Sequence, residues 1–311
     1  MRNECLNSVL RLAKKNKKVI FIGSDLGAGV LNQFKKEIPN RFYMEGISEQ
    51  HIIGMAAGMA KEGFIPYVNT IATFLTRRCF EQIAIDLCLH KLPVRLIGNG
   101  GGVVYAPLGP THQAIEDIAI MRALPNMSVF AVSDKVEMKK LMDASLSWPY
   151  PMYIRLGRGG DEIISSKKKF KIGKNIIYFK PKKITIVSTG VTTQECIRVV
   201  NSLKKKNIDC GLIHVHTIKP FDKKNFIKDI KNSSYIFTVE EHLSSGGLGG
   251  VISEIMSENN FSICKQVFRM GIEDKFVDKY GSQQELFSYL GINAASIEKK
   301  ILKIIKMKNE N

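Results

Sequence analysis

The sequence lacks the patterns that identify several large classes of protein. None of its apolar runs approaches the roughly 18 residues of a membrane-spanning helix, and residues 1–18 lack the apolar segment of a signal peptide. Its six cysteines are scattered without a C-x-x-C pair, which argues against a zinc site and a disulfide framework. The single tryptophan, and the lack of aromatic residues among the lysine runs, argue against a nucleic-acid surface. We therefore expect a cytoplasmic protein with reduced cysteines, and neither nucleic acid nor a membrane as its partner.

Positive charge, in contrast, is in excess. The chain has 46 Lys and Arg against 29 Asp and Glu, a formal net charge of +17, which can indicate nucleic acid, an acidic membrane surface or anionic substrates. The lysine runs at 14–18, 167–169 and 204–206 fall in helix faces, loops or tails, which favours a solvated surface. At roughly 100–200 residues per domain, the 311 residues indicate two domains.

Short apolar runs alternate with helical patterns along most of the chain. In the first half we expect strands at 19–25, 41–46, 65–71, 92–102 and 127–134, and helices at 48–63, 80–91, 114–124 and 135–147. The alternation restarts with strands at 183–190, 208–218 and 234–242, and helices at 192–207 and 251–259. This pattern is typical of doubly wound α/β domains with mostly parallel sheets. We predict one such domain over 1–165, a linker over 166–183 and a smaller α/β domain over 184–311.

Three segments place reactive side chains just beyond predicted strands, where open sheets bind ligands. Glu49 begins a largely apolar helix, so burial disfavours its anion while the helix N-terminus favours it. Such a carboxyl can share a proton with a heteroaromatic nitrogen, although a Glu that caps its own helix is an equal alternative. His112, in the turn GPTHQ at a predicted helix start, favours a neutral imidazole able to meet a ligand, although a lone His is more often structural. Phe74, beside Arg77 and Arg78, suits stacking on a flat ring, although such a Phe is more often core.

Other patterns carry less information. Arg155 and Arg158 alternate along an extended segment and suit the capture of phosphate or carboxylate, but surface arginine is common. The glycine clusters within 99–102 and 246–250 fit neither the dinucleotide nor the P-loop pattern, so tight packing is favoured over an anion cradle. The histidines at 214 and 216 project to one face of a strand without a third ligand, which argues against a metal site.

Taken together and in this order, five segments resemble the transketolase family. They are GISEQH, TFLTRRCFEQ, GPTHQ, YIRLGR and TVEEHLSSGGLGG. The resemblance covers residues 1–295 and is to the pyrimidine-binding domain and the C-terminal domain of transketolase and of 1-deoxyxylulose-5-phosphate synthase. It implies thiamine diphosphate as cofactor and the transfer of a two-carbon ketol unit (glycolaldehyde) from a ketose or its phosphate to an aldose.

The resemblance also implies roles for individual residues. Glu49 matches the glutamate that bonds the pyrimidine N1′ and so activates the thiazolium C2, and Phe74 matches the ring that stacks on the aminopyrimidine. His112 matches a histidine that contacts the substrate's oxygens during proton transfer. The remaining matches are Asp25 and Arg78 toward the cofactor, Gln113 toward the substrate, and Arg158 and Arg2 toward the substrate phosphate.

Two departures from the family bear on partners and substrate. The G-D-G…N motif that holds the diphosphate and Mg²⁺ is absent. This absence implies an N-terminal partner subunit carrying the Mg²⁺ ligands, an α₂β₂ heterotetramer, and no activity of this chain alone. Glycines at 100–102 replace a phosphate-binding His or Arg, and Leu108 replaces an Asp that recognises substrate hydroxyls, so the substrates need not be standard pentose phosphates. Two alternatives stay open: a 1-deoxyxylulose-5-phosphate-synthase-like or 2-oxo-acid-decarboxylating subunit, and a non-catalytic basic binding module on the same fold.

Overall fold

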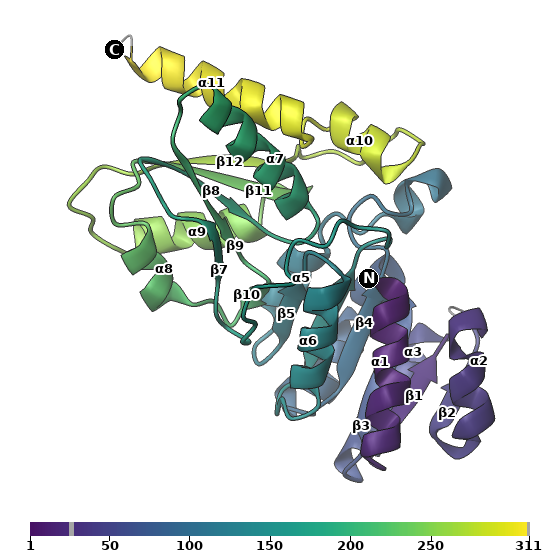
Figure 1. The fold of residues 1–311 in the computed structure, drawn as a ribbon. Helices are drawn as coiled ribbons and strands as arrows, with labels where there is room; N and C mark the ends of the chain where they lie inside the picture. Colours follow the sequence, from purple (N-terminus) through teal and green to yellow (C-terminus); the bar gives the residue numbers. More distant parts are fainter. Residues whose placement is uncertain (25–27, 310–311) are drawn as a thin grey trace.

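Two mostly parallel sheets organise the computed structural model, which describes residues 1–24 and 28–309 (Figure 1). The first sheet has seven strands in the order β10-β5-β6-β4-β3-β1-β2, and the second has five in the order β12-β11-β8-β9-β7. Neighbouring strands pair in parallel except β10 with β5 and β7 with β9. The predicted fold class, two doubly wound α/β units, is confirmed.

Within residues 1–24 and 28–156, the structure has six strands and six α-helices. The strands are β1 (Val19–Gly23), β2 (Phe42–Met44), β3 (Ile65–Ile71), β4 (Arg95–Asn99), β5 (Ser128–Ala131) and β6 (Met152–Leu156). The helices are α1 (Arg2–Lys15), α2 (Ala28–Glu37), α3 (Glu49–Lys61), α4 (Phe80–Gln82), α5 (Asp117–Ala123) and α6 (Lys135–Ser145). Shorter turns are the 3₁₀ helices η1 (Pro39–Arg41), η4 (Ala106–Leu108) and η5 (Pro110–His112) and the π-helical η2 (Phe74–Arg78) and η3 (Ile83–Leu89). Helix α5 begins three residues later than predicted because Ala114 pairs instead with Gly101 and Gly102 in isolated β-bridges.

The second half of the chain builds the other sheet and contributes to the first. Its strands are β7 (Ile176–Phe179), β8 (Ile184–Ser188), β9 (Cys210–His214), β10 (Thr217–Lys219), β11 (Tyr235–Leu243) and β12 (Gln266–Ile272). Its helices are α7 (Thr192–Lys205), α8 (Lys223–Asp229), α9 (Leu248–Ser257), α10 (Gln283–Tyr289) and α11 (Ala294–Asn309). Strand β7 lies within 166–183, and β10 extends the first sheet along β5, so the two halves share a sheet edge as well as a connecting chain.

Buried polar contacts also join the two halves. Arg155 on β6 donates through Nε to Asp117 Oδ2 at 2.7 Å and through Nη2 to the Glu241 carbonyl on β11 at 2.8 Å. The Tyr153 hydroxyl donates to the same Asp117 oxygen at 2.7 Å. The carboxylate that Arg155 binds is therefore the chain's own Asp117. The ion pair holds the guanidinium in place, and its second hydrogen bond, to the Glu241 carbonyl, connects β11 to the end of the first sheet.

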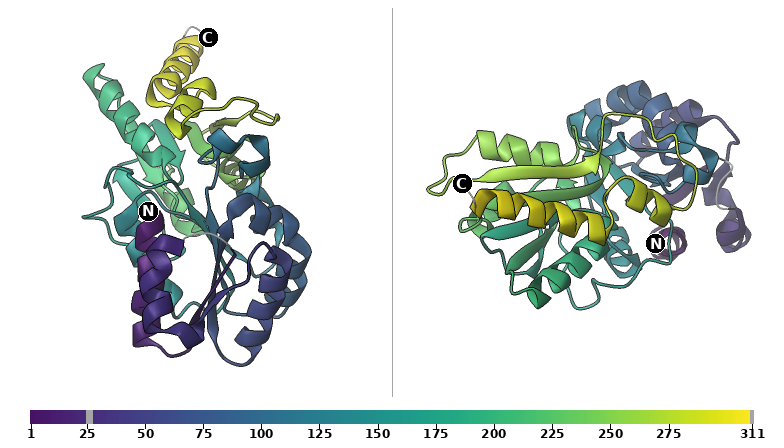
Figure 2. Two further views of the ribbon diagram at one scale, coloured as in Figure 1. Left: turned by 90° about the vertical axis from the view of Figure 1, so that its right-hand side faces the viewer. Right: turned by 90° about the horizontal axis from the view of Figure 1, so that it is seen from above.

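The helices at the two ends of the chain lie in different places. Helix α1 packs on α6 beside the first sheet, whereas α11 lies along α7 at the outer side of the second sheet (Figures 1 and 2). Across residues 1–24 and 28–309, no helix is both long enough and apolar enough to cross a bilayer.

Candidate active site

Four of the predicted site residues form one connected cluster. The Glu49 side chain is 3% exposed at the first residue of α3, and its Oε2 accepts a hydrogen bond from Arg78 Nη1 at 2.6 Å. The guanidinium carbon of Arg78 lies 4.6 Å from the centre of the Phe74 ring. That ring meets the His112 imidazole edge-on, with the two centres 5.1 Å apart. A buried carboxylate, an aromatic ring and an imidazole thus come together beyond β2, β3 and β4.

The π-helical turn η2 explains how two of these residues meet. It follows β3 and a short helical stretch, and its first and last residues are Phe74 and Arg78. The wide i→i+5 turn places these side chains on one side, and such turns occur frequently at functional sites. The Arg78 carbonyl accepts a hydrogen bond from Gln50 Nε2 at 3.0 Å, which ties η2 to the start of α3.

The start of α3 favours one interpretation of Glu49. Ser48 makes no side-chain cap and donates instead to the Glu45 carbonyl at 2.7 Å, while the Ser48 amide bonds Gly46. The Glu49 carboxylate binds Arg78, and no hydrogen bond from it to a backbone amide of α3 is seen among the described residues, which favours the ligand-facing interpretation over a helix cap. A buried carboxylate is costly without such a partner.

The Cys79 thiol next to Arg78 is not a nucleophile at neutral pH. Burial, and secondly the Glu49 charge, raise its pKa to about 12.

His112, a member of this cluster, and the neighbouring Gln113 lie in a turn rather than at a helix start. His112 ends η5, and its Nδ1 lies 2.9 Å from Thr111 Oγ1. The expectation that a helix N-terminus acts on this imidazole is thus wrong, because α5 begins further along the chain. The Gln113 side chain is 1% exposed, and both its amide atoms lack a hydrogen-bond partner in the part of the chain that the structure describes. The predicted cofactor residue Asp25 lies outside the described residues.

Arg2 and Arg158 lie apart from the cluster and line a cavity of about 380 Å³. The side chain of Met1 packs close to Gly157, which brings the start of α1 to the loop that carries Arg158. The Nε atom of Arg2 is buried without a partner among the described residues. The other lining residues are Asn99, Gly100, Val104, Tyr105, Pro107, Leu108, Gly157 and Ser282.

The glycines at 100–102 make room for side chains from other parts of the chain. A Cβ on the first would lie 2.2 Å from the Tyr105 ring, on the second 2.4 Å from Arg155 Cγ, and on the third 2.3 Å from the Glu241 carboxyl carbon. All three distances are too short for real Cβ contacts. The prediction of tight packing is confirmed for this cluster.

Two buried glutamates of β11 bind backbone amides. The Glu240 carboxylate accepts from the amides of Leu248 and Gly249, each at 2.7 Å, so the anion at the N-terminus of α9 belongs to the chain itself. Glu241 Oε1 accepts from the Val103 amide at 2.9 Å and from Gln283 Nε2 at 2.8 Å. Burial raises the pKa of Glu241 to about 7, although the nearby Arg155 charge lowers it. Sequence reasoning gave neither residue a role, although both lie in the segment TVEEHLSSGGLGG, because their hydrogen bonds form only in the folded chain.

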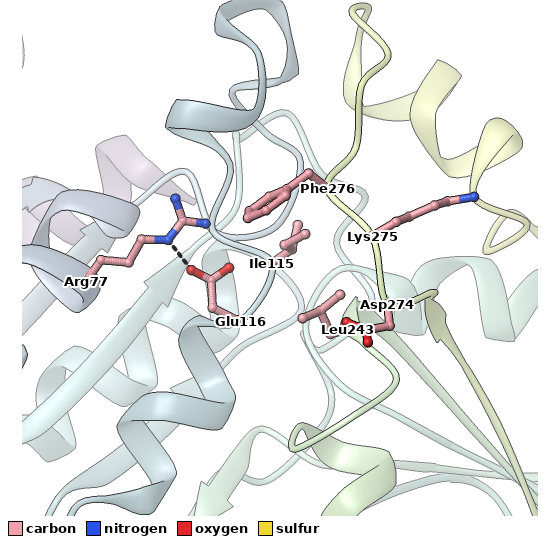
Figure 3. Close-up of a pocket in the computed structure, with 7 residues that line it drawn as sticks. All are labelled: Arg77, Ile115, Glu116, Leu243, Asp274, Lys275 and Phe276. Atoms are coloured by element: carbon pink, nitrogen blue, oxygen red, sulfur yellow. Dashed lines mark hydrogen bonds and ion pairs between the residues drawn. The ribbon is translucent and has the colours of Figure 1, made fainter.

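A second cavity, of about 480 Å³, adjoins the cluster through η2 (Figure 3). Arg77 is paired with Glu116 on one side, and the ring of Phe276 lies across from them. Lys275 points away from the cavity. Its complete lining is Arg77, Ile115, Glu116, Leu243, Asp274, Lys275 and Phe276. Sequence reasoning missed residues 274–276, which come close to Arg77 only in the folded chain.

The two strand histidines have partners within the protein. His214 Nε2 lies 3.0 Å from the buried Glu137 Oε2, and the His216 ring stacks on Phe170 with centres 4.3 Å apart. No group of three or more His, Cys, Asp or Glu within 1–24 and 28–309 could hold a metal ion.

Comparisons with known proteins agree with this architecture. Residues 1–160 match the family model of the transketolase pyrimidine-binding domain, and residues 173–297 match that of the transketolase C-terminal domain. A protein of Methanocaldococcus jannaschii named putative transketolase C-terminal section is 35% identical over 98% of this chain and 96% of its own length. A subunit of apulose-4-phosphate transketolase from Phocaeicola vulgatus is 32% identical over 98% of this chain and 97% of its own length.

Longer enzymes and a solved structure extend these comparisons. The chain is 32% identical to a 1-deoxy-D-xylulose-5-phosphate synthase of Caldanaerobacter subterraneus, and it spans 48% of that enzyme's length. A solved structure described as a split gene transketolase, inactive β4 tetramer, superposes with a TM-score of 0.88, at 31% identity and with 97% of each chain covered. The chain therefore belongs to the transketolase family of thiamine-diphosphate enzymes, in which it is a transketolase-like C-terminal subunit.

Proposed function

We propose that this chain carries the pyrimidine side of a thiamine-diphosphate site in a two-chain enzyme that transfers a two-carbon ketol unit from a ketose or its phosphate to an aldose. The observation that carries the proposal is the contact series from buried Glu49 through Arg78 and Phe74 to His112. Thiamine diphosphate supplies, when bound, the carbon nucleophile that adds to the ketose carbonyl.

The side chains fit the pyrimidine end of that cofactor. Glu49 is a buried carboxylate at a helix start, able to share a proton with a ring nitrogen, and Arg78 donates a hydrogen bond to it. Phe74 is half-buried and presents a ring for stacking. The outer residue of the series is the half-buried His112. Its Nδ1 lies 2.9 Å from Thr111 Oγ1, and its Nε2, which has no hydrogen-bond partner among residues 1–24 and 28–309, can exchange a proton with a substrate oxygen.

We place the anionic end of the substrate in the cavity of about 380 Å³ that Arg2 and Arg158 line. One loop connects the two places, because it lines the cavity at 104–108 and reaches His112 four residues later. The relative from Phocaeicola vulgatus is named for a sugar phosphate, apulose-4-phosphate, which supports this class of substrate. We propose that Gln113, which follows His112 in the chain and whose buried amide lacks a partner among the described residues, binds the sugar.

We further propose an N-terminal partner subunit that binds the diphosphate and carries the Mg²⁺ ligands, within a cytoplasmic α₂β₂ assembly. Two relatives are named as parts of an enzyme, one as a C-terminal section and the other as one of its subunits, which supports a second chain. The solved split-gene relative is described as inactive in its β4 form, which supports inactivity of this chain alone. The six cysteines are all free thiols, as a reducing compartment favours.

Reconstitution tests the proposal. The purified chain is mixed with its proposed diphosphate-binding partner chain, thiamine diphosphate and Mg²⁺, and two-carbon transfer between sugars is followed. We expect transfer from the pair and none from either chain alone. Full transfer by this chain alone contradicts the partner requirement. Pyruvate consumption with CO₂ release, in place of ketol transfer, contradicts the proposed reaction.

A further inference from the structure

We propose that Tyr105 is a specificity-determining residue of the substrate site, whose hydroxyl donates a hydrogen bond to the anionic end of the substrate beside Arg2 and Arg158. The inference rests on the proposed function, which supplies a phosphorylated sugar as the substrate. All three side chains line the same cavity of about 380 Å³.

The position of Tyr105 is set by the glycine at 100. A Cβ there would lie 2.2 Å from two carbons of the Tyr105 ring, and the φ of +77° at Gly100 disfavours other residues. The Tyr105 ring thus occupies the space that a side chain at 100 would fill. Glycine and tyrosine form a matched pair, in which the side chain that meets the substrate is supplied from five residues further along the chain.

The Tyr105 hydroxyl is suited to donate. Burial raises the pKa of this phenol, against a smaller opposite effect of the Arg2 charge, so it stays neutral and keeps its proton at physiological pH. No group within residues 1–24 and 28–309 is hydrogen-bonded to this hydroxyl, which is therefore available to a ligand.

The charge of the cavity selects the ligand class. Arg2 has a buried Nε without a partner among the described residues, and Arg158 is exposed. No acidic side chain is among the described lining residues, and Val104, Pro107 and Leu108 add apolar surface. Two guanidinium groups and a neutral O–H donor suit the oxygens of a phosphate, and the apolar surface suits a carbon chain. The ligand is thus a phosphorylated aldose or ketose with its phosphate at Tyr105.

The substitution Tyr105→Phe tests this role, because it removes the hydroxyl and keeps the ring over Gly100. Inorganic phosphate is titrated calorimetrically into the full-length chain. We expect the wild type to bind phosphate and Tyr105→Phe to bind it about tenfold more weakly, since a hydrogen bond to a charged group is lost. The matched control is Tyr280→Phe, which makes the same change on an exposed ring that packs on Gly109 outside the cavity lining and leaves the affinity unchanged.

The assembled two-chain enzyme gives a second readout. Tyr105→Phe should raise KM about tenfold for a phosphorylated acceptor, with kcat nearly unchanged and no effect on an unphosphorylated analogue. Three results overturn the inference: a wild-type chain that does not bind phosphate, equal affinities of wild type and Tyr105→Phe, or equal losses in the Tyr105 and Tyr280 variants. An assembled pair without ketol transfer instead refutes the proposed function, and it leaves the phosphate titration interpretable.

Discussion

Glu241 should make the stability of this protein fall as pH rises through neutrality. Burial raises its pKa to about 7 in the folded chain from the ordinary value of 4.5. Between those two values the folded state binds more protons than the unfolded state, so stability is fully present below pH 4.5 and is lost as pH rises through 7. This pKa shift corresponds to a decrease of about 3 kcal/mol in the free energy of unfolding. Glu241→Gln removes this dependence, because the amide stays neutral and its oxygen still accepts from Val103 and Gln283.

The test is urea denaturation of both proteins at closely spaced pH values from 5 to 8. Burial lowers the pKa of His216 to about 4. This histidine therefore has the opposite effect, because it lowers the stability of the protein as the pH drops below about 6.5. This effect is common to both proteins and cancels in their difference. As the pH rises from 5 to 8, we expect the free energy of unfolding of Glu241→Gln to increase by about 3 kcal/mol relative to that of wild type. Gln283→Ala removes a bond that lowers the Glu241 pKa and should shift the loss to higher pH. A difference between wild type and Glu241→Gln that is independent of pH would refute the reasoning.

Two further substitutions test packing at the site. Gly100→Ala forces a side chain into the Tyr105 ring at a φ of +77°. It should cost about 1–3 kcal/mol, and clearly less in a Tyr105→Ala background, as measured by urea denaturation; equal costs in both backgrounds contradict the matched pair. Arg155→Met leaves the buried Asp117 carboxylate unpaired and should lower stability by about 3–5 kcal/mol. Part of that loss should return with Asp117→Asn, and an Arg155→Met variant as stable as wild type would show that Arg155 does not hold β11 in place.

Local patterns predicted most strands and the helix that carries Glu49, because these elements follow the spacing of their own apolar residues. Helix α1 was not predicted, although Cys5, Leu6, Val9 and Leu12 recur at helical spacing and are buried. Strand β12 was missed because it lies at a sheet edge and most of its residues are only partly buried or exposed. The π-helical form of η2 has no propensity signal of its own.

The candidate site likewise contains residues that local sequence patterns indicate and residues that only the folded chain reveals. Glu49, Phe74 and His112 could be singled out because each carries recognisable chemistry just beyond a predicted strand. Arg155 has the same chemistry, but it proved to be a buried ion-pair partner. Glu241 could not be found from sequence, because its role depends on a contact with Val103, 138 residues away in the chain. Its place is decided by packing between the two halves.

Activation of the cofactor by Glu49 is the central claim, and proton exchange tests it most directly. In the assembled enzyme with thiamine diphosphate and Mg²⁺, exchange of the thiazolium C2 proton into D₂O is followed by quenched-flow NMR. Glu49→Gln should slow this exchange by about 10²-fold or more. His112→Ala should leave the exchange near the wild-type rate while it lowers sugar transfer. A Glu49→Gln enzyme that exchanges the proton at the wild-type rate would contradict the account.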